Sequence, residues 1–415
     1  MLHLVKTVWP LFLALALLMI GNGLQGSLLG LRAGLEGFSA TTTGLVMSAY
    51  YAGFLASSLL TPGLVRSVGH IRVFAAFASI ASSMVLLHAL YGNPLLWITL
   101  RFLTGFALAG LYVVAESWLN DIASNETRGR LLSLYVMNMY ACLALGQYTL
   151  AFADPAVSAP FIFVSILVSL SLVPISLAAR PQPLVEQVDA MSILELYRQS
   201  PLGVVACLLV GVAQGAFMGM GAVYGDLIDL STNQIALLLS LPLIAVVATQ
   251  LPIGTLSDRF DRRTVIAGVS AVVAACGAMA AFFGPEHLII LTILFTAYGA
   301  LSVPLYSLAV AHVNDVLPVS KMLAASAGMV FTFGVGSVIG PFVAGTAMQL
   351  LAPAAFFAIG AAIHAGLAVF ALYRMRQRPA PPREERTDFV PLGVRATSIA
   401  AVAAIDNAAE QNAPS

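Results

Sequence analysis

Charged residues are scarce in this sequence. Of its 415 residues only 9% are Asp, Glu, Lys or Arg, whereas 60% are hydrophobic. A soluble globular protein carries about 25% charged residues. The composition therefore excludes that class and predicts an integral membrane protein.

Cysteines and catalytic motifs are also few. The three cysteines, Cys142, Cys207 and Cys276, fall in separate apolar segments, which favours packing roles over disulfides or metal ligands. The chain has no phosphate-binding Gly-x-x-x-x-Gly-Lys-Ser/Thr run and no Cys/His cluster with metal-ligand spacing. We therefore predict a protein that is not an enzyme, is not driven by ATP, and has no cofactor and no bound metal.

What the sequence has in abundance is long apolar runs. Twelve of them are each about 20 residues long, the length at which a helix spans a bilayer. They lie at 7–31, 43–65, 73–91, 95–119, 131–152, 158–179, 202–224, 232–253, 264–283, 287–311, 322–350 and 353–373. The predicted fold is an all-α membrane protein with twelve transmembrane helices.

The positive charges are distributed unevenly between the connections. Arg32 is alone on one side of the predicted membrane and Arg101 lies within a span, so the other 17 of the 19 Lys and Arg (19 − 2) fall on the opposite side. Cytoplasmic loops carry the excess of Lys and Arg. We therefore expect both termini to be cytoplasmic.

The two halves of the chain repeat each other. Leu111-Tyr112, Asn120-Asp121, Gly105 and Gly146 recur at a constant offset of 194, and Gln25 to Gly30 is echoed by Gln214 to Gly219. Such self-similarity indicates repeated structural units. We predict an N-terminal six-helix bundle at 1–179, a cytoplasmic linker at 180–200 with a short amphipathic helix, a C-terminal six-helix bundle at 201–376, and a disordered cytoplasmic tail at 377–415.

One charged loop carries a recognisable motif. The segment Gly254-Thr-Leu-Ser-Asp-Arg-Phe-Asp-Arg-Arg263 resembles the signature loop of the major facilitator superfamily of transporters, with Asp261 where a second glycine is usual. Arg101-Phe-Leu-Thr-Gly105 is similar to that superfamily's Arg-x-x-Gln-Gly pattern, with Thr104 in place of Gln. Glu116-Ser-Trp-Leu-Asn120, followed by Glu126-Thr-Arg-Gly-Arg130, resembles its YcaD-like bacterial branch.

The resemblance implies a function and a mechanism. In that superfamily two six-helix bundles meet around a central cavity and rock against each other. It implies a secondary active transporter of a small solute in the bacterial inner membrane, acting as a monomer in the lipid bilayer without a nucleic-acid partner. Transport is proton-coupled if Glu116 or another cavity carboxylate titrates. The alternative is a membrane receptor or assembly factor that kept the fold and lost transport.

Arg101 is the one positive residue within a predicted span. Burying it costs about 3 kcal/mol or more unless it is paired or hydrated, so we expect it to face the cavity. Tyr112 and Glu116 lie on the same face of its helix. Arg101 then anchors the substrate or takes part in a proton relay, with Glu116 as the proton-coupling candidate; alternatively, backbone carbonyls hold Arg101 and it fixes helix packing.

Amides and tyrosines complete the predicted substrate site. Asn22 and Gln25 in the first span, and Gln214 in the seventh, suit hydrogen bonding to a neutral or zwitterionic solute, but they can equally join helices together. Tyr112, Tyr298 and Tyr306 can form an aromatic wall or serve as packing. His364 in the twelfth span is interpreted as a packing residue.

The resemblance also implies a latch at the inner ends of the C-terminal helices. It places Asp258, Arg259 and Arg262 beside an acid at the end of the tenth span, a position that Asp315 occupies. We expect such a latch to hold in the outward-open state and to part when the cavity opens inward.

The first half should have a different latch. Asp121 is the repeat counterpart of Asp315, and the loop that faces it offers Arg66, His70 and Arg72 but no acid. We therefore expect positive charge to meet Asp121 directly.

Overall fold

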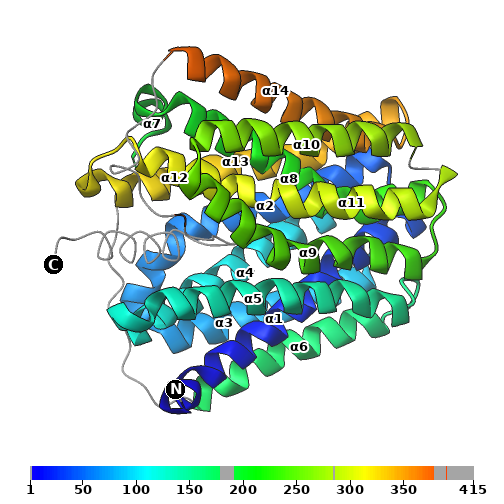
Figure 1. Ribbon diagram of the computed structural model, residues 1–415. Helices are drawn as coiled ribbons and strands as arrows, with labels where there is room; N and C mark the ends of the chain where they lie inside the picture. The colour runs from blue at the N-terminus through cyan, green and yellow to red at the C-terminus, as the bar shows by residue number, and fades with distance from the viewer. Residues whose placement is uncertain (1, 178–190, 284–285, 378–388, 390–415) are drawn as a thin grey trace.

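The computed structural model describes residues 2–177, 191–283, 286–377 and 389 of the chain. Within these residues every regular element is a helix (Figure 1). The elements are α1 (Leu2–Leu35), α2 (Ala40–Val68), α3 (His70–Leu90), α4 (Pro94–Ile122), α5 (Asn125–Thr149), the 3-10 helix η1 (Leu150–Phe152), α6 (Ala159–Leu177), α7 (Ile193–Gln199), α8 (Pro201–Leu227), α9 (Thr232–Arg259), α10 (Arg262–Phe283), α11 (Leu288–Ser302), α12 (Pro304–Asn314), α13 (Val319–Leu350) and α14 (Ala355–Gln377). The all-α prediction is confirmed.

Most of these helices are long and apolar enough to cross a bilayer. Eleven spans meet both conditions in the described part of the chain, with α11 and α12 counted as one. Helix α5 is also long, at 25 residues, but its first two turns include Glu126, Arg128 and Arg130. Because α5 packs against both α1 and α9, it is the twelfth span (11 + 1), as predicted.

The span predicted at 287–311 is divided in the structure, with α11 ending at Ser302 and α12 beginning at Pro304. Proline has no N–H, so the carbonyl of Ala300, four residues earlier, loses its helical partner. The hydroxyl of Thr249 on α9 donates a hydrogen bond to that carbonyl at 2.8 Å. A proline in a membrane helix requires such a substitute partner, and here a neighbouring helix supplies it.

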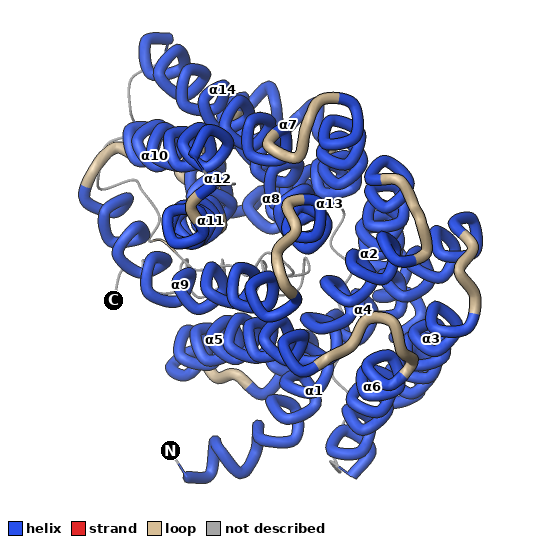
Figure 2. Tube along the Cα trace, turned by 90° about the vertical axis from the view of Figure 1, so that its right-hand side faces the viewer, coloured by secondary structure: helices blue, strands red, loops and turns tan. Residues whose placement is uncertain are grey.

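The spans form two groups, which are the two repeat halves. In Figure 2, α1 to α6 lie along the bottom and right of the molecule and α8 to α14 along its top and left. We call these groups the N-half and the C-half. They touch mainly where α2 packs against α13 and where α5 packs against α9. The predicted six-plus-six architecture is confirmed.

The two membrane sides are named by charge. We call the side with most Lys and Arg the inner side, which lies on the left in Figure 1. Helices α2, α4, α9 and α12 end there, whereas α1, α8 and α13 end on the opposite, outer side.

The halves are in tight contact on the outer side. A Cβ atom added to Gly44 of α2 would lie 2.5 Å from the carbonyl oxygen of Pro341 on α13, and one added to Gly345 of α13 would clash with the carbonyl of Ala40. Small residues allow membrane helices to approach backbone to backbone. These two glycines therefore bring the outer ends of α2 and α13 together.

Hydrogen bonds reinforce the same contact. The N–H of Phe342 donates to Ser48 Oγ at 3.2 Å, and the hydroxyl of Thr41 donates to Thr346 Oγ1 at 3.4 Å. We call this set of contacts between the outer halves of α2 and α13 the outer seal.

A short helix occupies the connection between the halves. Helix α7 is capped by Ser192, buries Leu196 and pairs Glu195 with Lys321 of α13 at 3.2 Å. It lies within 180–200, the range predicted as a cytoplasmic linker with a short amphipathic helix, and that role stays a prediction. The rest of the predicted linker at 180–190, and the predicted tail apart from Phe389, lie outside the described residues.

Candidate functional site

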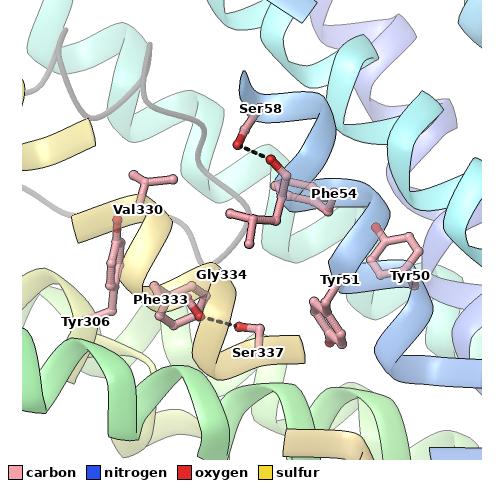
Figure 3. A pocket seen from close by; sticks show the side chains of 10 residues that line it. Tyr50, Tyr51, Phe54, Ser58, Tyr306, Val330, Phe333, Gly334 and Ser337 are labelled. Atoms are coloured by element: carbon pink, nitrogen blue, oxygen red, sulfur yellow. Dashed lines mark hydrogen bonds between the residues drawn. The ribbon is translucent and has the colours of Figure 1, made fainter. Parts of the chain in front are cut away.

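A pocket lies between the two halves, on the inner side of the outer seal (Figure 3). Helix α2 forms its N-half wall, and α12 and α13 form its C-half wall. The lining residues are Tyr50, Tyr51, Phe54, Leu55, Ser58, Tyr306, Val330, Phe333, Gly334 and Ser337. Five of these ten are aromatic, and none is Asp, Glu, Lys, Arg or His. The pocket is therefore aromatic and without formal charge.

Helix periodicity explains how the pocket walls arise. Tyr50, Phe54 and Ser58 are spaced four residues apart, so they lie along one face of α2. Phe333 and Ser337 have the same spacing on α13 and line the opposite wall of the pocket (Figure 3). Figure 3 also shows Tyr306 beside Phe333, with their ring centres 4.7 Å apart.

The two serines of the pocket use their protons within their own helices. Ser58 donates to the carbonyl of Leu55 at 2.8 Å, and Ser337 donates to that of Phe333 at 3.0 Å (Figure 3). A hydroxyl oxygen that has donated its proton can still accept a hydrogen bond. Both serines thus present acceptors to a molecule in the pocket.

A polar cluster lies behind Tyr50 in the N-half. The amide of Asn22 donates to the hydroxyl of Tyr50 at 3.1 Å and to that of Tyr112 at 2.8 Å. These residues come from α1, α2 and α4, and all three are buried. Asn22 therefore joins three helices, which is the second of the two interpretations of this residue, and it orients a ring that lines the pocket.

Arg101 belongs to the same cluster, but it does not line the pocket. Its guanidinium carbon lies 4.4 Å from the centre of the Tyr50 ring, Nη2 lies 3.8 Å from the sulfur of Met47, and its exposed fraction is only 4%. The Tyr50 ring stabilises the cation through its π face. The predicted role of Arg101 in substrate binding stays a prediction.

The two repeat-related glutamines differ in their surroundings. Gln214 donates to Ser302 Oγ at 2.9 Å, whereas the buried Nε2 of Gln25 has no hydrogen-bond partner among the described residues. Neither glutamine lines the pocket. Their predicted role as substrate ligands stays a prediction.

The Gln214 contact continues into a network inside the C-half. Ser302 Oγ lies 2.9 Å from Nε2 of the buried His364, and the Tyr298 hydroxyl lies 3.5 Å from its Nδ1. His364 thus joins α14 to α11 and, through Ser302, to α8. Tyr298 lies against this histidine and does not line the aromatic pocket, whereas Tyr306 does. The predicted substrate-binding roles of both tyrosines stay predictions.

Glu116 is buried against α5. Its carboxylate accepts a hydrogen bond from the Tyr135 hydroxyl at 2.5 Å, and its exposed fraction is 2%. The carboxylate is therefore held inside the N-half at the inner part of α4. Its proposed part in proton coupling is not tested by this geometry.

The predicted charged set of the C-half is present. Arg262 lies 3.2 Å from Asp315 and 3.2 Å from Asp258, and both Arg262 and Asp315 are almost fully buried. Arg263 pairs with Asp261 at 2.7 Å. Arg259 is exposed and makes none of these contacts in the described residues, so its inclusion in the set is corrected.

The ion pairs of Arg262 with Asp258 and Asp315 are formed in a structure whose outer seal is closed. Asp258, Arg262 and Asp315 all belong to the C-half, so closing α2 against α13 does not separate them. The expectation that the set parts when the cavity opens inward is not tested by this geometry. Its role as a latch between conformations stays a prediction.

The N-half has no equivalent set. Asp121 is exposed and takes part in no ion pair among the described residues. His70, expected to face it, lies 3.0 Å from the Ser117 hydroxyl through Nε2 and stacks on Trp118. The expected pairing of positive charge with Asp121 stays a prediction.

One residue of the C-terminal segment reaches the signature loop. The N–H of Phe389 donates to Asp258 Oδ1 at 3.1 Å, and its ring fills the space that a Cβ at Gly254 would occupy. The same carboxylate therefore holds both Arg262 and Phe389. This contact was not predicted, since the whole segment after 376 was expected to be disordered.

Most pocket residues were missed by sequence reasoning. The predicted site residues did not include Tyr50, Tyr51, Phe54 or Phe333. The available signal was the spacing of aromatic and hydroxyl residues along the second predicted span. No group of three His, Cys, Asp or Glu side chains able to hold a metal ion occurs in the described ranges.

Known proteins resemble this chain in sequence. The family model described as Major Facilitator Superfamily matches residues 11–234 and 205–405. The protein described as "Uncharacterized MFS-type transporter YcaD" from Escherichia coli O7:K1 (strain IAI39 / ExPEC) is 27% identical over 350 residues, which cover 83% of this chain and 89% of that relative. The YcaD protein of Escherichia coli O17:K52:H18 (strain UMN026 / ExPEC) matches with the same identity and coverage.

Solved structures resemble its fold. The crystal structure of the nucleoside transporter NupG superimposes with a TM-score of 0.73 at 14% identity, covering 89% of this chain and 100% of that one. A bacterial homolog of the human lysosomal transporter Spinster, in an inward-facing and unoccupied conformation, superimposes with a TM-score of 0.67 at 14% identity, covering 98% of each chain.

Proposed function

The chain belongs to the major facilitator superfamily of transporters, and from this we propose that it carries one small solute across the bacterial inner membrane by alternating access. Both resemblances drawn from the sequence, to the superfamily and to its YcaD-type members, are confirmed. The protein is thus a multi-pass membrane transporter of some solute. The proposal adds four points: passage of the solute between the two halves, alternating access as the mechanism, a cytoplasmic position for both termini, and action as a monomer.

The position of the aromatic pocket supports passage of the solute between the two halves. Its two walls come from different repeat halves, so any movement of one half against the other changes the pocket and its access. A site at the repeat interface, around which the halves rock, is the geometry that alternating access requires. We therefore propose this pocket as the substrate site.

The outer seal supports the mechanism. It closes the outer ends of α2 and α13 while the pocket lies on its inner side, which corresponds to one of the two states that a rocking transporter visits. We propose that the glycine contacts of the seal open when the pocket faces outward. Proton coupling through Glu116 belongs to the same proposal, with protonation breaking its interaction with Tyr135 during the cycle.

Cross-linking the outer seal tests the proposal. The hydroxyls of Thr41 and Thr346 are 3.4 Å apart, so the double variant Thr41→Cys/Thr346→Cys places two sulfurs within disulfide reach. Proteoliposomes containing it are loaded with a bacterial small-molecule extract, and solute loss is followed by mass spectrometry. We expect export of one solute class, stopped by oxidation and restored by a reductant.

The single-cysteine variants are the matched controls and should transport under both conditions. Absence of flux for every solute in the reduced state would support a receptor or assembly factor. Flux that continues after complete cross-linking would contradict alternating access.

A further inference from the structure

We propose that the ligand of the aromatic pocket is a flat, uncharged molecule that carries at least one N–H or O–H donor. This inference rests on the proposed function, because it assigns a chemical class to the proposed substrate site. Three features of the pocket lead to it: its rings, its lack of charge and the state of its hydroxyl groups.

The rings favour a flat ligand. Tyr51 and Phe54 lie across the pocket from Tyr306 and Phe333 (Figure 3), and Tyr50 also lines the α2 wall. Aromatic side chains pack best against other π systems in offset or edge-to-face geometry. A planar conjugated molecule packs against such walls with both of its faces, whereas a sugar would leave several of its hydroxyl groups without hydrogen-bond partners there.

The absence of charge excludes ionic ligands. An ion buried without a partner is strongly disfavoured, and no acidic or basic side chain lines the pocket. Arg101, whose guanidinium lies 4.4 Å from the centre of the Tyr50 ring, is not a lining residue, so an anion in the pocket meets no lining cation. The same guanidinium occupies one face of Tyr50 and disfavours a second cation on that ring.

The serines set the hydrogen-bonding requirement. Ser58 and Ser337 already donate to carbonyls of their own helices at 2.8 and 3.0 Å. They therefore act as acceptors towards the ligand, and one serine lies on each wall. A ligand with N–H or O–H groups satisfies them, whereas a ligand with acceptors only does not.

A matched set of probes tests the inference on wild-type protein in lipid nanodiscs by isothermal titration calorimetry. The probes are 2-naphthamide, N,N-dimethyl-2-naphthamide, 2-naphthoate, (2-naphthylmethyl)trimethylammonium and decahydro-2-naphthamide. We expect 2-naphthamide to bind with a Kd on the order of 1 mM or tighter, and each of the other four at least about tenfold more weakly. Equal binding of the carboxylate, the cation or the saturated amide, or no binding of 2-naphthamide, would overturn the inference.

Substitutions of pocket residues test whether 2-naphthamide binds in this pocket. Phe333→Leu should weaken 2-naphthamide binding by about tenfold. Ser337→Ala should weaken it by about fivefold and leave the dimethyl amide unaffected. The control is Phe163→Leu, because Phe163 of α6 is 44% exposed on the surface of the bundle and should have no effect. Unchanged affinity in folded Phe333→Leu and Ser337→Ala would place the ligand elsewhere and overturn the inference.

The outcomes separate this inference from the proposed function. Transport of a charged or saturated solute that stops on cross-linking Thr41→Cys/Thr346→Cys would support transport and overturn the ligand class. Selective 2-naphthamide binding without flux of any solute would support the ligand class and overturn transport.

Discussion

At the scale of single residues, repeat-related positions have diverged in their contacts. Gln214 bonds to Ser302 and through it to His364, while Gln25 has a buried amide nitrogen without a described partner. Removing a bonded polar group leaves its partners unsatisfied, whereas replacing an unbonded one by an apolar side chain removes a desolvation cost. Their substitutions should therefore differ.

We expect Gln214→Leu to lower the free energy of unfolding by about 1–3 kcal/mol and Gln25→Leu to leave it unchanged or raise it. Reversible unfolding of the purified protein in mixed micelles measures both. Equal losses for the two variants would show that Gln25 has bonds that this structure lacks.

The contact of Phe389 with the signature loop leads to a second prediction at this scale. Phe389→Ala removes the ring, and Gly254→Ala fills its place with a methyl group, so both should weaken the contact of Phe389 with α9. We expect each variant to lower the free energy of unfolding by about 1 kcal/mol or more, measured by reversible unfolding in mixed micelles. Tyr373→Ala, at an exposed residue of α14, is the control, and an unchanged stability in Gly254→Ala would contradict the contact.

At the scale of helices, the division between α11 and α12 depends on a neighbour. Thr249 supplies the hydrogen bond that the carbonyl of Ala300 loses because of Pro304. We expect Thr249→Val to destabilise the wild type by about 1–2 kcal/mol and to have less effect in the Pro304→Ala background, where the backbone N–H is restored. A double-mutant cycle measures this coupling; strictly additive effects would rule it out.

The ends of α10 and α12 are joined by a buried ion pair, which leads to a further prediction. Neutralising one partner leaves the other charge buried, a change that costs about 3 kcal/mol or more. Asp315→Asn should therefore lower the free energy of unfolding by about 3 kcal/mol, while the exposed Asp121→Asn should change it by less than about 0.5 kcal/mol. Similar losses in both variants would mean that Asp121 has a buried partner too.

At the scale of the whole molecule, the outer seal controls how the halves sit against each other. Gly44 has no room for a Cβ because Pro341 is 2.5 Å from its position, whereas Gly63 on the same helix has open space. We expect Gly44→Val to disfavour the sealed state by about 1–3 kcal/mol through overpacking, and Gly63→Val to leave it unchanged.

Spin labels at Leu90→Cys and Leu351→Cys report the separation of the two outer ends, since both residues are exposed there. In Gly44→Val the distance distribution should shift towards longer values, and in Gly63→Val it should match that of the labelled protein without a glycine substitution. A shift in both variants would show that the glycine contact is not the determinant.

The sequence by itself determined the membrane class, the twelve spans, the two repeats and the family. Each of these depends on properties that are local along the chain. A bilayer requires about 20 apolar residues per helix, and a repeat or a signature loop such as Gly254 to Arg263 is a pattern of neighbours. Even the Arg262 and Asp315 pair could be predicted, because the loop motif and the repeat offset specify both positions.

The tertiary structure alone decided which polar side chains meet and which rings line the pocket. In a membrane helix nearly every position is apolar, so composition does not distinguish a lipid-facing ring from a pocket ring such as Tyr50 or Phe333. Arg101 has the same local sequence whether it faces a cavity or a tyrosine ring, and the choice depends on the rotation of α4 against α2. That rotation is set by close glycine contacts between helices distant in the chain, which no local pattern specifies.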